Sequence, residues 1–275
     1  MTISLVVTTA AKLTPIAERL AHEISVLLSK PYIPRQGRSL VDIYGASEAS
    51  RLLVVGADQL RLYDRASGAE YFYHPNMFLS RGSVVLAGGS DHFLSAVNLR
   101  RGETLLDCTL GFASESALAS LTLNGTGKVV GLESEAVLAE VTRRGLQTFV
   151  LRSELLTAAL RRVEVITADN LTFLQRCKPR AFDVVYFDPF FDERLSGSEA
   201  SVTPLFVFGN SAPLSSDAVE NARRVARRCV VIKHPIHIDL PGSIPQWVTK
   251  THGGRKSRIV YSVLETWNQE TWNQE

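Results

Sequence analysis

The sequence predicts an α/β fold in which helices cover a mostly parallel sheet, and two observations support this. From about Gly82, strand-like apolar runs alternate with helical stretches, a pattern typical of parallel sheets covered on both faces. The strand-like runs are residues 104–108, 129–133, 163–167, 182–187 and 229–233. Near the end, residues 247–251 and 258–264 flank a GGRKS turn and predict an antiparallel hairpin. We therefore expect a Rossmann-like α/β domain that closes with a C-terminal antiparallel hairpin.

The first 80 residues show a different pattern, with one helix and several short strands. Residues 3–7 form a strand-like run, and residues 14–29 have apolar residues at helical spacing after an N-cap threonine and a proline. Short runs at 52–55, 60–63 and 71–73 predict an antiparallel meander. We expect an N-terminal α+β section at residues 1–80 and the Rossmann-like domain at residues 81–265. In the tail, residues 266–275, TWNQE occurs twice, and we expect this segment to be disordered or artefactual.

Composition narrows the class of protein. The chain has 275 residues, 45% of them hydrophobic, which is enough to bury a substantial core without disulfides or metals. Its net charge of +2 is a mild basic bias that is compatible with nucleic acid. Cys108, Cys177 and Cys229 lie far apart, in no metal-ligand spacing, which favours a reducing cytoplasm and no metal centre. Because no apolar run approaches ~18 residues, we expect no membrane span.

The segment LLDCTLGFASES, residues 105–116, predicts a tight turn from a strand into a helix. The strand ends in Asp107, the turn passes Gly111, and the helix begins near Ser114. Such turns at the carboxyl edge of a parallel sheet bind nucleotides, although an ordinary turn would look the same. The dinucleotide pattern G-x-G-x-x-G is absent because Ala113 replaces its second glycine, so the turn has no cradle for a pyrophosphate. S-adenosylmethionine (SAM) has no phosphate, and the turn suits it.

The next two predicted strands end in polar residues that suit the same cofactor. Glu133 ends the second strand, where a carboxylate can accept hydrogen bonds from both ribose hydroxyls. Asp169 and Asn170 end the third strand, where they can meet the adenine amino group. A solvated strand end, or a helix N-cap at Asp169, is the alternative. Because all these positions fall at one edge of one sheet, we expect a SAM site there.

The segment FDVVYFDPFFDE, residues 182–193, predicts the reacting end of the site. Asp188-Pro189-Phe190-Phe191 resembles the (D/N)PP(Y/F) signature of methyltransferases that act on amino groups of nucleobases. Such an amine is a weak nucleophile and must be held in line with the methyl group. Asp188 and a carbonyl near Pro189 could accept its N–H bonds, and Phe190 or Phe191 could stack on the base. The alternative is that Pro189 only ends a strand and both phenylalanines belong to the core.

Taken together, these motifs resemble the bacterial small-subunit ribosomal RNA guanine-N2 methyltransferases, over most of the chain. The matching segments are DCTLGFASE at 107–115, GLES at 131–134, DN at 169–170, VVYFDPFFD at 184–192 and VIKHP at 231–235. The resemblance implies a class I methyltransferase that uses SAM to methylate the exocyclic amine of a guanine, with small-subunit ribosomal RNA or the subunit itself as partner. The implied catalytic residues are Asp188, Pro189 and Phe191. The expected cofactor-binding residues are Asp107, Thr109, Gly111, Phe112, Ser114, Glu115, Glu133, Ser134, Asp169, Asn170 and Asp188.

Several alternatives stay open at this point. Adenine is the main rival of guanine, and the chain could also methylate DNA or another substrate, or bind SAM or RNA without catalysis. After Phe191 this chain has DERLS, where the resembling family has a basic run that suits phosphate. Arginines 223, 224, 227 and 228 are expected in one helix, either as a solvated face or as an RNA-binding patch.

Overall fold

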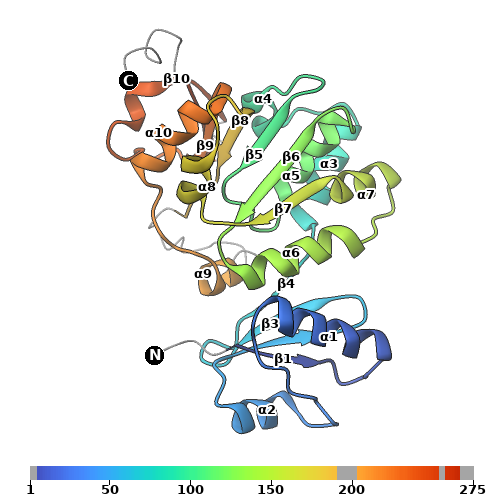
Figure 1. Ribbon diagram of the computed structural model, residues 1–275. Helices are drawn as coiled ribbons and strands as arrows, with labels where there is room; N and C mark the ends of the chain where they lie inside the picture. Colours follow the sequence, from blue (N-terminus) through green and yellow to red (C-terminus); the bar gives the residue numbers. More distant parts are fainter. Residues whose placement is uncertain (1–4, 191–202, 254–257, 267–275) are drawn as a thin grey trace. The chain divides into compact units, whose positions relative to one another are not determined.

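The computed structural model describes residues 5–190, 203–253 and 258–266, which form two compact units (Figure 1). Unit 1 comprises Met1–His74, Glu135–Phe149 and Leu195–Asn210, and unit 2 comprises Pro75–Ser134, Val150–Arg194 and Ser211–Glu275. The predicted catalytic residue Phe191 and residues 267–275 of the repeated tail lie outside the described ranges. The domain boundary expected at residue 80 stays a prediction.

Unit 2 is built on a seven-stranded sheet, in the order β10-β11-β9-β8-β5-β6-β7 (Figure 1). The strands are β5 (Thr104–Asp107), β6 (Lys128–Glu133), β7 (Val163–Thr167), β8 (Phe182–Phe187), β9 (Ala226–Pro235), β10 (Val248–Gly253) and β11 (Ile259–Leu264). Strands β5 to β9 pair in parallel, whereas β11 pairs antiparallel with both β9 and β10. The predicted α/β class, with its parallel strands and closing hairpin, is confirmed.

Helices cover both faces of this sheet. They are α3 (Asn76–Leu86), α4 (His92–Val97), α5 (Ser114–Leu123), α7 (Glu154–Arg161), α8 (Asn170–Arg176) and α10 (Ser216–Val225), with a 3-10 turn at Ile244–Trp247. On one face, Leu106 and Val185 join a buried core with side chains of α8 and α10, including Leu174. On the other face, Tyr186 packs its ring edge-on against Phe93 of α4. Successive strand residues point to opposite faces, which is why both faces need an apolar cover.

Unit 1 contains a smaller, four-stranded sheet. Its elements are β1 (Leu5–Thr9), β2 (Arg51–Val55), β3 (Leu60–Asp64), β4 (Glu70–Phe72), α1 (Pro15–Leu27), α2 (Leu40–Ser47), α6 (Ala136–Thr148) and α9 (Thr203–Phe208). Strands β2, β3 and β4 form the predicted antiparallel meander, and β1 adds in parallel to β2. Thr14 caps α1 by accepting a hydrogen bond from the Ala17 amide at 3.1 Å, which confirms the predicted start of that helix. The sequence did not predict α2, which begins with a capping box made by Ser39 and Asp42.

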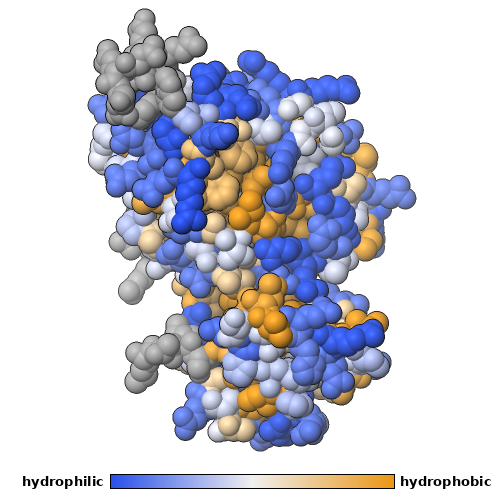
Figure 2. All heavy atoms as spheres, in the orientation of Figure 1, coloured by the Kyte–Doolittle hydropathy of each residue, from blue (hydrophilic) through white to orange (hydrophobic). Residues whose placement is uncertain are grey.

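Most large apolar side chains are buried, and hydrophilic residues cover most of the face shown in Figure 2. Of the helices within the described ranges, none is long and apolar enough to cross a membrane.

The arginines expected in a single helix lie in two different elements. Helix α10 ends at Val225, and β9 begins at the next residue, so Arg223 and Arg224 are helical whereas Arg227 and Arg228 are in the strand. The one-helix prediction was wrong because β9 pairs with β8 from Ala226 onward, and this pairing overrides local helix propensity.

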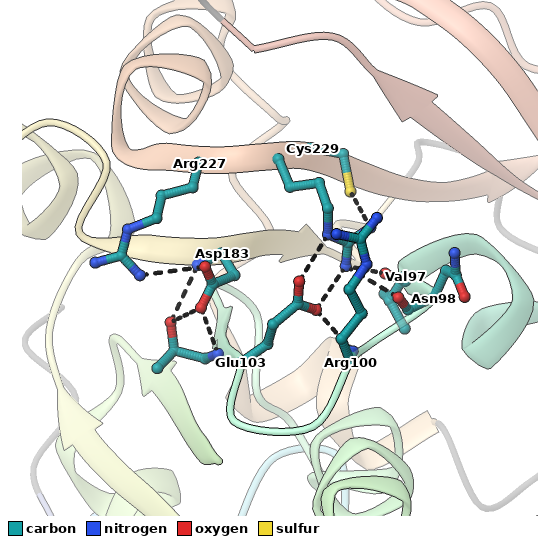
Figure 3. Close-up of polar contacts among 9 residues, drawn as sticks. Val97, Asn98, Arg100, Glu103, Asp183, Arg227 and Cys229 are labelled. Atoms are coloured by element: carbon teal, nitrogen blue, oxygen red, sulfur yellow. Dashed lines mark hydrogen bonds and ion pairs between the residues drawn. The ribbon is translucent and has the colours of Figure 1, made fainter.

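These arginines bind other parts of unit 2. Arg224 donates to the carbonyls of Leu174 and Cys177 at the C-terminal end of α8, at 2.7 and 2.8 Å. Arg228 pairs with Glu103 at 3.0 Å and donates to the carbonyls of Val97 and Asn98 (Figure 3). The close-up also shows Arg227, which lies in β9 like Arg228, donating a hydrogen bond to Asp183 of β8. Several arginines thus fasten helix ends and loops to the sheet.

Replacing Arg228 by alanine should destabilise the protein by about 3 kcal/mol, because the largely buried Glu103 would lose its cationic partner and be left with the hydrogen bond from the Arg100 amide. Urea unfolding measures this as a lower midpoint with an unchanged slope. The matched control is Arg227→Ala, which removes a more exposed pair and should cost less than about 1 kcal/mol. Asp183 keeps its bonds from the Thr104 amide and hydroxyl in that control. Equal losses in the two variants would contradict the role assigned to Arg228.

Candidate active site

The turn between β5 and α5 has an unusual backbone. Gly111 and Ala113 both adopt positive φ, at 50° and 58°, and Ala113 immediately precedes the first residue of α5. A non-glycine residue in this region is uncommon and is found disproportionately at functional sites. The Leu110 amide donates to the Leu132 carbonyl at 3.0 Å, which ties the turn to the end of β6. The predicted tight turn is therefore present and lies against the neighbouring strand.

Asp107 organises this turn from within. Its carboxylate accepts a hydrogen bond from the Thr109 amide at 3.0 Å and one from the Ser116 hydroxyl at 2.7 Å. Burial raises the pKa of Asp107 to about 7, although these two hydrogen bonds oppose the shift. Each carboxylate oxygen already has a partner in the protein, so the observed role of Asp107 is to shape the turn. Its expected contact with the cofactor stays a prediction.

The carboxyl ends of the neighbouring strands lie at the same edge of the sheet. Glu133 is the last residue of β6 and is half-buried, and its carbonyl accepts a hydrogen bond from the Ala168 amide at 3.0 Å. Asp169 caps α8 by accepting from the Thr172 amide, and Asn170 donates to the Cys108 carbonyl at 3.4 Å. The side chain of Asp169 is therefore a helix N-cap, as the alternative interpretation predicted. Asn170 joins the segment after β7 to the turn after β5.

The structure places each described member of the predicted cofactor set at this edge. Ser114 and Glu115 begin α5 and are buried, whereas Phe112 and Ser134 are half-buried in the turns after β5 and β6. The donor set fits SAM: a carboxylate ends β6 where a ribose diol needs an acceptor, and the first turn lacks a pyrophosphate cradle. Which of these residues touch the cofactor stays a prediction.

Asp188 follows β8 directly and is held at two points. Its amide donates to the Thr109 hydroxyl at 2.6 Å, which joins the end of β8 to the turn after β5. Its Oδ2 accepts from the Nζ of Lys233 at 2.7 Å. Pro189 and Phe190 follow, both half-buried, so the predicted aspartate and proline do sit at the edge that carries Glu133.

Lys233 belongs to a cluster of five charged side chains that the sequence did not predict to lie together. The cluster consists of Asp91, Arg81, Glu115, Lys233 and Asp188. The ammonium of Lys233 also lies 3.4 Å from Oε1 of Glu115, and the same oxygen accepts from Arg81 at 2.6 Å. Arg81 in turn makes a two-pronged contact with Asp91, at 2.9 and 3.0 Å. The side chains are between 11% and 33% exposed, so water screens their charges only in part.

Burial and charge act in opposite directions on these groups. Burial alone would raise the pKa of Glu115, but Lys233 and Arg81 together hold it at about 2. Burial raises the pKa of Asp188 above its ordinary value, and the Lys233 ammonium opposes that shift. Burial would lower the pKa of Lys233, yet the two carboxylates raise it, so this lysine stays protonated.

Comparison with known proteins identifies the family of this chain. The family described as "Putative SAM-dependent methyltransferase" matches residues 42–258. The chain belongs to this family. It therefore uses SAM as cofactor and is a methyltransferase, as the sequence predicted.

One relative and one solved structure show how far the likeness extends. The Bacillus subtilis (strain 168) protein named "Uncharacterized protein YpiP" is 35% identical over 215 residues, 78% of this chain and 82% of that protein. The crystal structure of the SAM-dependent methyltransferase NGO1261 from Neisseria gonorrhoeae is 16% identical, with a TM-score of 0.61. That likeness covers 98% of this chain and 99% of the other, and at this identity it concerns the fold alone.

Proposed function

We propose that this methyltransferase methylates the exocyclic amine of a guanine in RNA, with small-subunit ribosomal RNA as the expected substrate. The observation that carries the proposal is the position of Asp188, a carboxylate held at the end of β8 and followed by Pro189. It lies at the same sheet edge as Glu133, the residue that best suits the ribose of SAM.

The arrangement supports amine chemistry in physical terms. When bound, SAM supplies an electrophilic methyl group on a sulfonium. The lone pair of a guanine amine is delocalised into the ring, so the protein must hold the amine in line with that methyl group. Because Lys233 binds Oδ2 of Asp188, its Oδ1 is the oxygen that would accept an N–H bond from the amine. A methylated amine loses its extra proton readily to water, so the site needs no separate general base.

Support for RNA comes from the sequence. Asp188-Pro189-Phe190-Phe191 resembles the signature of nucleobase amino-methyltransferases, and the wider motifs resemble enzymes of small-subunit ribosomal RNA. An aromatic residue beside the proline suits stacking on an extruded base. The choice of guanine over adenine rests on the resemblance.

The test is nucleoside analysis by mass spectrometry. RNA from a deletion strain should lack one N2-methylguanosine, and the purified protein with SAM should restore it. An N6-methyladenosine product would replace guanine by adenine in the proposal. A product methylated on carbon or on ribose would exclude the amine mechanism, and methylation of DNA alone would exclude RNA.

Replacing Phe191 by alanine should weaken RNA binding by about 1–3 kcal/mol, the contribution of one base–aromatic stack. SAM affinity should stay close to that of the unchanged protein. Filter binding of RNA and calorimetry of SAM measure the two affinities separately. Phe190→Ala is the matched control, and if it weakens RNA binding while Phe191→Ala does not, the stacking role belongs to Phe190.

A further inference from the structure

We infer that Lys233 is the positioning residue for Asp188, and that the cluster reaching back to α4 holds this lysine in place. Lys233 binds one oxygen of the Asp188 carboxylate and leaves the other oxygen to accept a hydrogen bond from the amine that is to be methylated. The inference rests on the proposed function for the role of Asp188, but the linkage between the two side chains can be measured without any substrate.

The strand register brings the two residues together. Phe187 of β8 pairs with Ile232 of β9, so the next residues, Asp188 and Lys233, face each other across neighbouring central strands. Their side chains meet at 2.7 Å between Nζ and Oδ2. A site held by residues on strands keeps its geometry more closely than one held by loops alone.

The remaining charged residues keep Lys233 in this position. Glu115, at the start of α5, lies 3.4 Å from the ammonium, and Arg81 of α3 holds Glu115 at 2.6 Å. Arg81 is fixed by Asp91, which also caps α4 by accepting from the Leu94 amide at 3.1 Å. The chain of contacts thus runs from a helix end to the reacting edge of the sheet, and it alternates in charge at every step.

The surroundings make the ion pair stronger than it would be in water. Tyr186, one residue before the end of β8, is buried with its ring edge-on to Phe93 at 4.8 Å between centroids. Tyr261 of β11 is also buried, and its ring centroid lies 6.1 Å from that of Phe93. These rings limit access of water to the strands that carry Asp188 and Lys233, and charge interactions weaken less there than at an open surface.

Removing the ammonium should therefore change the protonation of Asp188. The charged and titratable groups that act on Asp188 or lie beside it are Lys233 from β9, Glu115 from α5, Arg81 from α3, Asp107 from β5, Tyr186 from β8 and Tyr261 from β11. Without Lys233, two carboxylates and the effect of burial would oppose ionisation, and only the more distant guanidinium would favour it. The pKa of Asp188 should rise, so its carboxylate would be protonated, and unable to accept the N–H bond of the amine through that oxygen, over a wider range of acidic pH.

The experiment compares Lys233→Met with Lys233→Arg and with Lys128→Met. Methionine keeps the length of the side chain without its charge, whereas Lys128 is an exposed lysine paired with Glu164 on β6 and β7. Carbon-13 NMR of labelled aspartate, assigned with Asp188→Asn, follows the Asp188 carboxylate in the absence of RNA. In Lys233→Met its midpoint should move up by about 1–3 pH units, the usual effect of an opposite charge at this distance. Lys233→Arg and Lys128→Met should leave it within a few tenths of the wild-type value.

A second variant should move the midpoint of the Asp188 titration in the opposite direction. Glu115→Gln removes a like charge and leaves Lys233 to Asp188 alone, so the Asp188 midpoint should fall. A contact that acts by packing alone, without charge, would not give opposite shifts in the two variants. Because Glu115→Gln keeps the shape of the side chain, it serves also if Lys233→Met does not fold.

Methyl transfer to RNA then connects the linkage to the reaction. The acid limb of the single-turnover rate should follow the NMR midpoint in wild type, Lys233→Met and Glu115→Gln. An unchanged Asp188 midpoint in both Lys233→Met and Glu115→Gln would overturn the inference, whatever the enzyme methylates. Shifted midpoints in a protein that methylates no base amine would refute the proposed function and leave the linkage standing.

Discussion

Replacing Asp188 by alanine should lower the single-turnover rate of methyl transfer by about 10²–10³-fold, a typical effect of losing a group that orients or stabilises the reacting centre. The carboxylate is fixed through Thr109 and Lys233, so the geometry that it imposes on the amine would be lost with it. Rapid quench with labelled SAM and saturating RNA measures the chemical step directly. The dissociation constant of SAM should change much less than this rate.

The matched variant is Asp188→Asn, which keeps an oxygen acceptor but loses the charge. Its rate should lie between those of wild type and Asp188→Ala, because the amide can still accept one N–H bond. Thermal unfolding of both variants controls for Lys233, which loses the negative charge of its partner in each of them. An Asp188→Ala protein that binds SAM and methylates RNA at the wild-type rate would refute the proposed mechanism.

The sheet could be predicted because its signals are local. Short runs rich in β-branched and aromatic residues predict strands, and VEVIT and FDVVYF coincide with β7 and β8 at both ends. Once the strands are parallel, their carboxyl ends must share an edge. That rule alone predicted that Glu133 and Asp188 lie at the same edge of the sheet.

The charged cluster could not be predicted in this way because its contacts join residues far apart in the chain. Arg81 reaches Glu115 across 34 positions, and Glu115 reaches Lys233 across 118. No spacing rule links such residues, although a lysine at the end of the apolar run CVVI was a usable signal for Lys233. The same limitation explains Arg228, whose neighbours suggested a helix whereas pairing with β8 made it part of a strand.

A second limitation concerns what a side chain does at a correctly predicted position. The predicted contact of Asp107 with the cofactor stays a prediction, and the structure adds that its two oxygens accept hydrogen bonds from Thr109 and Ser116. A sequence pattern places a carboxylate at the end of β5 and does not show which hydrogen bonds it makes. The distinction needs the position of α5, which the packing of unit 2 determines.

Replacing Glu133 by alanine should weaken SAM binding by about 3 kcal/mol, on the order of 100-fold in Kd, because two ribose hydroxyls would lose a charged acceptor. The effect should be confined to the cofactor, since the backbone contacts of Glu133 remain available to alanine. These are its pairing with Thr167 of β7 and the bond from the Ala168 amide. Isothermal titration calorimetry with SAM measures the change.

Two further variants separate hydrogen bonding from general loss of negative charge. Glu133→Gln retains an oxygen acceptor and should lose less affinity than Glu133→Ala. Glu164→Ala removes an exposed carboxylate near the start of β7, where its partner is Lys128, and should leave SAM affinity unchanged. If Glu133→Ala bound SAM as tightly as wild type, the end of β6 would not be the ribose site. The cofactor would then have to be anchored mainly by the turn after β5, where Gly111 and Ala113 already hold the backbone in the left-handed region.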